Sequence, residues 1–285
     1  MEYFSGINGI PFTFNVMMGI CLVGILVLIV GLLLDIRKWG QGSVGYGIEP
    51  APGKKGFIGT YFKQLFHGEG HQGLIATIIL DIILLRRTFR ADWVRWIMHM
   101  CIFYGWMGLF SLSGLMFAGE MIHKFGLLHF DIELFRAMLQ FPNQILGYIL
   151  LAGIFIAVAR RLFNPVVRKS TNAYDTVMIA TLVIVVVTGF IAHAGRFIIV
   201  PNVYGVEFVV PVLNWGLSEA MLLEIHDYMF WTLGGLHFFY DYVMEFALLH
   251  SILAMFVGFA FIPYSKYIHA VATPLTLLVN RGGEH

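Results

Sequence analysis

Histidines in or beside the apolar runs of the chain are the residues best suited to chemistry. His250 lies well inside one such run, and His269 follows nineteen residues later, just past the end of the same run. An ionisable side chain in hydrocarbon is costly without a partner, so it indicates a functional site. Two imidazoles near opposite ends of one membrane helix can each offer a nitrogen to a metal, one metal near each membrane face. With the histidines elsewhere in the chain, this pattern predicts a membrane cytochrome that carries two haems.

Membrane-spanning helices must position these histidines. The 285 residues are 59% hydrophobic and only 12% charged, a composition that excludes an ordinary soluble domain. The formal net charge is +1 and the basic residues are scattered, so nothing points to nucleic acid. A helix crosses the bilayer with about 20 apolar residues. We therefore expect an all-α membrane protein, a single integral-membrane cytochrome b domain over residues 1–285, with five transmembrane helices at about 14–34, 96–117, 144–163, 176–196 and 243–262.

The basic residues divide sharply between the segments that connect these spans. Segments 35–95 and 160–173 and the tail after residue 263 hold fifteen Lys or Arg, against three in the opposite segments. Short loops rich in Lys and Arg stay in the cytoplasm. This bias predicts an N-terminus outside and a C-terminus in the cytoplasm, for a multi-pass protein of the cytoplasmic membrane.

Two further segments are apolar or aromatic without being predicted as spans. Residues 73–85, within the cytoplasmic loop 35–95, are interrupted by Asp81 and followed by three arginines, which suits an interfacial helix or a docking surface. Residues 228–240 are rich in aromatic side chains and lie outside. They either fold back over the outer leaflet or begin the fifth helix early.

Depth in the membrane tests how the histidines pair, because two axial imidazoles must lie at one depth on facing helices. His99 lies about one turn into the second span at its cytoplasmic edge, and this depth matches His269. His193 lies one turn before Arg196, in the outer half of the fourth span, and this depth matches His250, roughly 10 Å below the outer end of the fifth helix. The rise from His250 to His269 is at most about 28 Å along a continuous helix, which is enough for two stacked haems.

Simpler explanations stay open for these residues. A single histidine in a membrane helix can hydrogen-bond to a neighbouring helix. Gly105 and Gly108 after His99, and Gly189 and Gly195 around His193, would let a flat macrocycle approach the backbone, but such glycines serve helix packing more often. Without His193 as a ligand, the outer haem would be five-coordinate through His250.

The cysteines and the outer polar residues bear on partners and on the electron carrier. Cys21 and Cys101 are expected to be packed thiols, and without a cysteine cluster this chain cannot by itself hold an iron–sulfur centre. A lipophilic carrier would dock near the outer face, where protons are released. The candidate residues for that carrier site are Arg136, Glu224, His237 and Asp241.

Two stretches of the sequence resemble the gamma subunit family of respiratory nitrate reductases. Residues 160–168 (RRLFNPVVR) resemble the loop between that family's third and fourth helices. Residues 250–274, with IPYSK shortly before His269, resemble its fifth helix and the inner end of that helix. The similarity covers most of the chain from about residue 95 to residue 274. It implies that His250 binds the outer haem b, and that His99 and His269 bind the inner one.

One position departs from that family and points to a closer resemblance. The family carries a second histidine ten residues after the first in the second helix, where this chain has Leu109. The outer haem then needs another ligand, and depth nominates His193. The pattern W-x-x-H-x-x-x-x-x-G-W from Trp96 and the run TGF from Thr188 are more similar to the cytochrome b subunits of membrane-bound heterodisulfide reductases.

This closer resemblance implies a function. The chain would oxidise a reduced lipophilic carrier near the outer face and pass electrons through two haems b to a cytoplasmic iron–sulfur subunit with two 4Fe–4S clusters. That partner would reduce the heterodisulfide of coenzyme M and coenzyme B. The carrier is methanophenazine in the methanogen proteins and menaquinone in bacterial relatives. The chain itself would be an oxidoreductase subunit without residues for the terminal reduction.

Two other functions stay open at this point. A respiratory nitrate reductase gamma subunit, or a menaquinol-oxidising subunit of a sulfur-metabolism complex, would have the same architecture, although Leu109 counts against the former. A haem-free transporter or proton-conducting subunit would use the histidines as a relay. The odd number of predicted spans and the lack of an inverted repeat count against a transporter.

Overall fold

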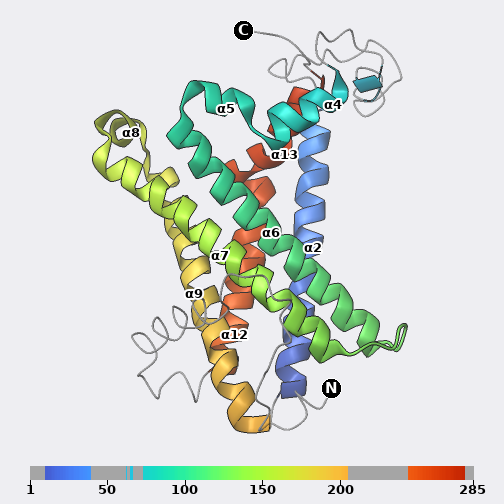
Figure 1. Ribbon diagram of the computed structural model, residues 1–285. Coiled ribbons are helices and arrows are strands. Elements are labelled where there is room, and N and C mark those ends of the chain that lie inside the picture. The colour runs from blue at the N-terminus through green and yellow to red at the C-terminus, as the bar shows by residue number, and fades with distance from the viewer. Residues whose placement is uncertain (1–9, 40–61, 63–64, 67–72, 205–242, 280–285) are drawn as a thin grey trace. The chain divides into compact units, whose positions relative to one another are not determined.

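The computed structural model describes residues 10–39, 62, 65–66, 73–204 and 243–279 (Figure 1). Within these ranges the chain is helical and contains no strand, as predicted for an all-α protein. The fold divides into two compact units. One unit is Met1–Trp96 with Ser251–His285, and the other is Ile97–His250.

Four helices are long and apolar enough to cross a membrane. They cover Asn15–Trp39, Trp93–His123, Phe141–Phe163 and Ala173–Ala192, and they coincide with the first four predicted spans. In the fifth predicted span the described residues form a shorter apolar helix, Phe246–Ala260. A fifth span therefore stays a prediction.

The unit Ile97–His250 is built mainly from three long helices. They are α6 (Trp93–Lys124, apart from its first turn), α7 (Ile132–Phe163) and α9 (Ala173–Tyr204). The short helix α8, Pro165–Ser170, connects α7 to α9, and α12 runs over Val243–Ile252.

The motif at residues 160–168 folds as the end of one helix and the start of the next. The Asn164 side chain accepts hydrogen bonds from the backbone N–H groups of Val166 and Val167, at 3.0 and 3.2 Å. Pro165 occupies the first turn of α8, where its missing N–H costs nothing. The motif therefore has a structural reason, a capped helix start that reverses the chain between α7 and α9.

Glycines bring α6 and α7 into close contact. A Cβ atom on Gly105 would lie 2.7 Å from the backbone nitrogen of Leu150, and one on Gly108 would lie 2.7 Å from Leu146 Cδ1. The later residue of α6, Gly108, contacts the earlier residue of α7, Leu146, so the two helices run antiparallel. Small residues at membrane helix interfaces allow this approach. Gly105 and Gly108 thus serve helix packing, which is one of the two roles that the sequence left open.

We predict that Gly105→Ala destabilises the helix pair α6 and α7. The added methyl group would meet backbone atoms of Leu150, which cannot turn aside, and overpacking of this kind costs about 1–3 kcal/mol. Thermal unfolding in one detergent, followed by circular dichroism, measures the loss. Gly114→Ala on the same helix is the control, because nothing lies within 4 Å of its Cβ position and alanine favours a helix. Equal unfolding temperatures for the two variants would contradict this packing.

Phe190 fixes the rotation of α9 on α7. Its ring stacks on Tyr148 with ring centroids 4.9 Å apart. It also fills the space left by Gly147, whose Cβ would lie 3.1 Å from Phe190 Cζ. Because Phe190 faces α7, the two residues before it, Thr188 and Gly189, lie on other sides of α9. The packing of Phe190 on α7 therefore fixes the positions of Thr188 and Gly189.

In the other unit, α2 (Ile10–Trp39) packs on the turns that continue the chain beyond α12. A Cβ at Gly24 would lie 2.5 Å from Met255 Cγ, and one at Gly31 would lie 2.6 Å from Pro263 Cγ. The two glycines are seven residues apart and share one helix face. Elsewhere α2 exposes large apolar side chains, including Leu26. The turns and helix of this region are the π-helix η3 (Leu253–Ala260), the 3-10 turns η4 (Ile262–Tyr264) and η5 (Lys266–Ile268), and α13 (His269–Val279).

The segment predicted as a helix at residues 73–85 is helical. It begins with α4 (Leu74–Ala76) and continues as the π-helix η2 (Thr77–Ile83). A turn leads from η2 into the short helix α5 (Arg86–Ala91), and η2 packs on α13. Its location at the membrane interface stays a prediction.

Candidate functional site

His250 of α12 lies against α9 in the unit Ile97–His250. The imidazole Nδ1 is 3.0 Å from Thr188 Oγ1. A Cβ at Gly189 would lie 3.0 Å from His250 Cε1 and 3.4 Å from Nε2, so the ring rests directly on the α9 backbone. Helices α9 and α12 lie side by side there, as Figure 1 shows. Thr188 and Gly189 of α9 therefore contact the His250 ring, although His250 lies 62 positions from Thr188 in sequence.

The Thr188 hydroxyl bears on which ring nitrogen of His250 carries the proton. The Thr188 hydroxyl donates to the backbone carbonyl oxygens of Ile184 and Val185, at 2.7 and 3.1 Å. A hydroxyl has one proton, so its oxygen faces His250 as an acceptor. With the hydroxyl proton directed to a carbonyl, the neutral imidazole carries its hydrogen on Nδ1 and keeps the lone pair on Nε2. Histidines that bind metals are commonly oriented in this way, by a hydrogen bond from the other ring nitrogen.

These surroundings fit an axial ligand of a haem. The hydrogen bond to a neighbouring helix, which the sequence left open as a simpler role for His250, is present and uses only Nδ1. Nε2 remains as a neutral nitrogen donor, the donor that haem iron takes from histidine. Gly189 makes room for the imidazole itself, because any larger residue would press on Cε1 and Nε2.

His193, the predicted second ligand of the outer haem, lies on α9 one turn beyond Gly189. Residues four apart on a helix share a face, so position 193 continues the face on which Gly189 meets His250. The backbone of His193 is described and its side chain is not. Ligation by His193 therefore stays a prediction.

His269 and His99, predicted to bind the inner haem, lie in different units. His269 is the first residue of α13, it is exposed, and its Nδ1 donates to the carbonyl oxygen of Lys266. As at His250, this bond leaves the lone pair on Nε2. His99 lies on α6. The pairing of His99 with His269 stays a prediction.

The predicted carrier site falls mostly outside the described residues. Arg136 lies on α7, whereas Glu224, His237 and Asp241 belong to the undescribed range 205–242. Across the described ranges, no three His, Cys, Asp or Glu side chains gather in a way that could hold a metal ion.

Thr188 is a site residue whose role the sequence did not predict. Threonine is common in membrane helices and usually bonds back to its own helix, as Thr181 does to Met178 at 2.8 Å. The available signal was the position of Thr188, five residues before His193 and next to Gly189, within the run TGF. Only the fold brings His250 to that run.

The fold and the site define a class: a multi-pass helical membrane protein in which a histidine of one helix forms a hydrogen bond with another helix. Residues 75–213 match the family model of the E subunit of dihydromethanophenazine:CoB--CoM heterodisulfide reductase. Curated proteins of that name are similar over the whole chain. The relative from Methanosarcina thermophila is 38% identical over 294 residues, covering 100% of this chain and 98% of the relative. The relative from Methanosarcina mazei is 40% identical over 292 residues and covers 100% of both chains.

The chain belongs to the family of heterodisulfide reductase E subunits, which are cytochrome b subunits of an oxidoreductase complex. The predicted resemblance to the cytochrome b subunits of membrane-bound heterodisulfide reductases is thereby confirmed. The similarity to nitrate reductase gamma subunits stays a resemblance of two motifs. No solved structure matches the chain.

Proposed function

We propose that this chain oxidises reduced methanophenazine near the outer membrane face and delivers the electrons, through two haems b, to a cytoplasmic partner that reduces the CoB–CoM heterodisulfide. The observation that carries the proposal is the hydrogen bond between His250 Nδ1 and Thr188 on a neighbouring helix. It leaves the Nε2 lone pair of a histidine within an apolar helix as a candidate ligand for a metal. The printed names of the relatives, which give dihydromethanophenazine as the reductant, favour methanophenazine over menaquinone.

The topology proposed for this function has five spans, with the N-terminus outside and the C-terminus in the cytoplasm of the cell membrane. Four apolar helices and the shorter helix Phe246–Ala260 supply the spans. The segments proposed as cytoplasmic hold fifteen Lys or Arg and the opposite segments hold three, and this bias sets the orientation in the membrane. In this orientation His250 lies nearer the outer face, and His269 lies nearer the cytoplasm.

The residues proposed to hold the haems are His250 with His193 at the outer site, and His99 with His269 at the inner site. A bound haem carries one electron at a time on its iron. The chain contributes fixed ligand geometry, because Thr188 orients His250 and the Lys266 carbonyl orients His269. It also keeps the reduced carrier apart from the terminal reaction.

A partner subunit is proposed for the terminal reduction because this chain has only two cysteines. Cys21 and Cys101 are free thiols on different helices, so they cannot ligate an iron–sulfur cluster. A cytoplasmic subunit with two 4Fe–4S clusters would take the electrons. The basic cytoplasmic segments of this chain would receive it.

The carrier is proposed to dock at the outer face. Arg136, Glu224, His237 and Asp241 are polar residues of the outer segments and are the candidates for binding the carrier and accepting its protons. Oxidation of a two-electron, two-proton carrier releases two protons there. The ionisable side chains at that face would take them up before they reach the solvent.

A reduced-minus-oxidised optical spectrum of the purified chain, with haem counted per polypeptide, tests the proposal. Two b-type haems per chain are expected. Reduction by a dihydrophenazine and not by menaquinol would then assign the carrier. Material isolated in mild detergent without any haem would contradict the electron-transfer function and favour a proton relay through the same histidines.

The proposed outer pair makes a further prediction. Replacing His193 with Ala or Met should remove the outer haem and leave the inner haem, since one of two axial ligands is lost at the outer site alone. Haem content and the optical spectrum measure this. The exposed loop residue His129 provides the control, because His129→Ala should leave both haems in place. Full occupancy of both haems in His193→Ala would show that the pairing by depth is wrong.

A further inference from the structure

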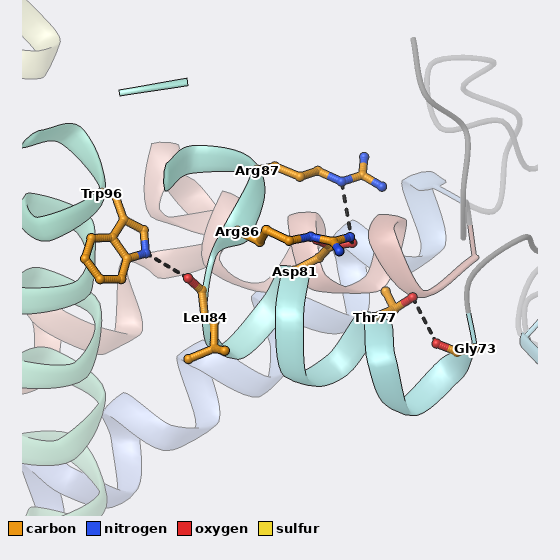
Figure 2. Close-up of polar contacts among 7 residues, drawn as sticks. All are labelled: Gly73, Thr77, Asp81, Leu84, Arg86, Arg87 and Trp96. Atoms are coloured by element: carbon orange, nitrogen blue, oxygen red, sulfur yellow. Dashed lines mark hydrogen bonds and ion pairs between the residues drawn. The ribbon is translucent and has the colours of Figure 1, made fainter. Parts of the chain in front are cut away.

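Asp81 is the one charged residue that is buried among the residues the structure describes. Its carboxylate is 0% exposed and is held by two arginines, as Figure 2 shows. Arg86 Nε lies 3.1 Å from Oδ1 and Nη2 lies 3.4 Å from Oδ2, while Arg87 Nε lies 3.6 Å from Oδ2. The two guanidinium groups are the ion-pair partners of this buried carboxylate, and removing one partner of a buried ion pair is strongly destabilising.

These ion pairs bridge a sharp turn. Leu85 has φ 49° and ψ 42°, a left-handed conformation that a leucine adopts only when its surroundings impose it. Asp81 lies in η2 before this turn and Arg86 begins α5 after it, so the ion pair ties the two helices across Leu85. On the other side of the turn, Trp96 Nε1 donates to the Leu84 carbonyl oxygen at 2.7 Å (Figure 2). The backbone at this turn is therefore held from two directions.

The π-helix η2 packs on α13 and has one buried face. The two buried residues of η2 are Thr77 and Asp81, four residues apart on one face. Apart from its chain neighbours α4 and α5, the element with which η2 packs most extensively is α13. Ile75 and Ile79 lie away from that face and are exposed. Asp81 is thus a buried residue of the π-helix that packs on α13, the helix that His269 begins.

We propose that Asp81 is a positioning residue for His269. Its ion pairs with Arg86 and Arg87 brace η2, which packs on α13, and α13 begins with His269, whose imidazole bonds to the Lys266 carbonyl. The role of η2 as a support for α13 stands on the packing alone. That His269 binds a haem rests on the proposed function.

Asp81→Asn in the purified full-length chain tests this role, because it removes the charge and keeps the shape. Backbone hydrogen exchange in α13 is expected to speed up. In a redox titration the inner haem should show a shifted midpoint, because the axial ligand helps to set the potential of a haem. Part of its low-spin ferric signal should become high-spin, as expected when a histidine ligand is misplaced. The outer haem should keep its midpoint.

Two further variants separate positioning from a general loss of structure. Asp92→Asn makes the same change eleven residues later, where Asp92 accepts the backbone N–H groups of Val94 and Arg95 at 2.9 and 3.0 Å. Asparagine caps a helix equally well, so both haems should be unchanged. Arg86→Gln should reproduce the effect of Asp81→Asn, and the double variant should be little worse than either single one.

The outcomes distinguish this inference from the function on which it rests. Unchanged hydrogen exchange in α13 of Asp81→Asn would overturn the positioning role. Equal shifts at both haems would overturn it as well, since they would reflect general damage. A wild-type chain that binds no haem would overturn the proposed function instead, and the exchange rates in α13 would still decide whether Asp81 supports that helix.

Discussion

Replacing His250 with alanine is expected to remove the outer haem and to leave the inner haem in place. The fold controls the orientation of His250 through Thr188 on one nitrogen and the backbone at Gly189 beside the other. Loss of an orienting neighbour of a metal ligand typically costs 10- to 100-fold in affinity, and loss of the ligand itself costs more. Haem per polypeptide and the optical spectrum measure the result. Reduction of the remaining haem by the carrier should then fall to background.

A milder change at the same place gives a graded result. Thr188→Val keeps the shape of the side chain and removes the oxygen that accepts from His250 Nδ1, so haem affinity at the outer site should fall by about 10- to 100-fold. Thr181→Val is the matched control on α9, since Thr181 bonds only to its own helix, at Met178. If His250→Ala retained two haems, His250 would not be a ligand. If both threonine variants behaved alike, Thr188 would have no orienting role.

Replacing His269 with alanine should have the second large effect, the loss of electron delivery to the partner. The inner haem should be lost, because the imidazole whose Nδ1 donates to the Lys266 carbonyl is removed. Reduction of the outer haem by the carrier should continue. In the complex with the partner subunit, heterodisulfide reduction driven by the carrier should therefore fall to background, while reduction by an artificial donor to the partner persists.

A substitution further along α13 controls for damage to that helix. Thr276→Val lies two turns beyond His269, and the Thr276 hydroxyl bonds only to its own helix, at the Ala272 carbonyl at 2.8 Å. It should leave both haems and the coupled activity unchanged. Retention of a low-spin inner haem in His269→Ala would mean that another residue binds it, and the pairing with His99 would be wrong.

The long helices were predictable because their apolar runs have the length of a bilayer. The predicted spans at 96–117 and 176–196 lie inside helices that extend further, over Trp93–Lys124 and Ala173–Tyr204. Hydropathy locates the part of a helix that suits hydrocarbon, whereas helix ends depend on caps and on chain reversal. The Asn164 cap of α8 is one such signal, and it was present in the motif without being interpreted as a cap.

The π-helices and α13 were not predicted, for two different reasons. The stretches η2 and η3 differ from an α-helix only in closing i→i+5 hydrogen bonds, a choice that local packing decides and that leaves no mark in apolar periodicity. Helix α13 follows Pro263 and an extended residue, Ser265, so the pattern of the fifth span ends before it begins. It contains a proline of its own, Pro274.

Within the candidate site, the sequence located the histidines but not what holds them. His250 was singled out by its apolar surroundings, whereas the acceptor on Thr188 lies on another helix, and no local pattern links the two. Likewise, Asp81 was visible as a charge within an apolar segment, but its burial between Arg86 and Arg87 follows from the left-handed turn at Leu85. Contacts of this kind depend on tertiary packing, which spacing along the chain does not specify.

The two faces of helix α2 should differ in how freely their residues vary among relatives. Gly24 and Gly31 lie so close to neighbouring side chains that a larger residue would force those side chains to move, whereas Leu22, Leu26 and Leu33 are more than half exposed on a helix suited to lipid. Lipid hydrocarbon solvates one apolar side chain about as well as another. Evolutionary drift should therefore be rapid on the outward face of α2 and nearly absent at its two glycines. In relatives only 38–40% identical to this chain, leucine, isoleucine, valine and phenylalanine should replace one another freely along that face.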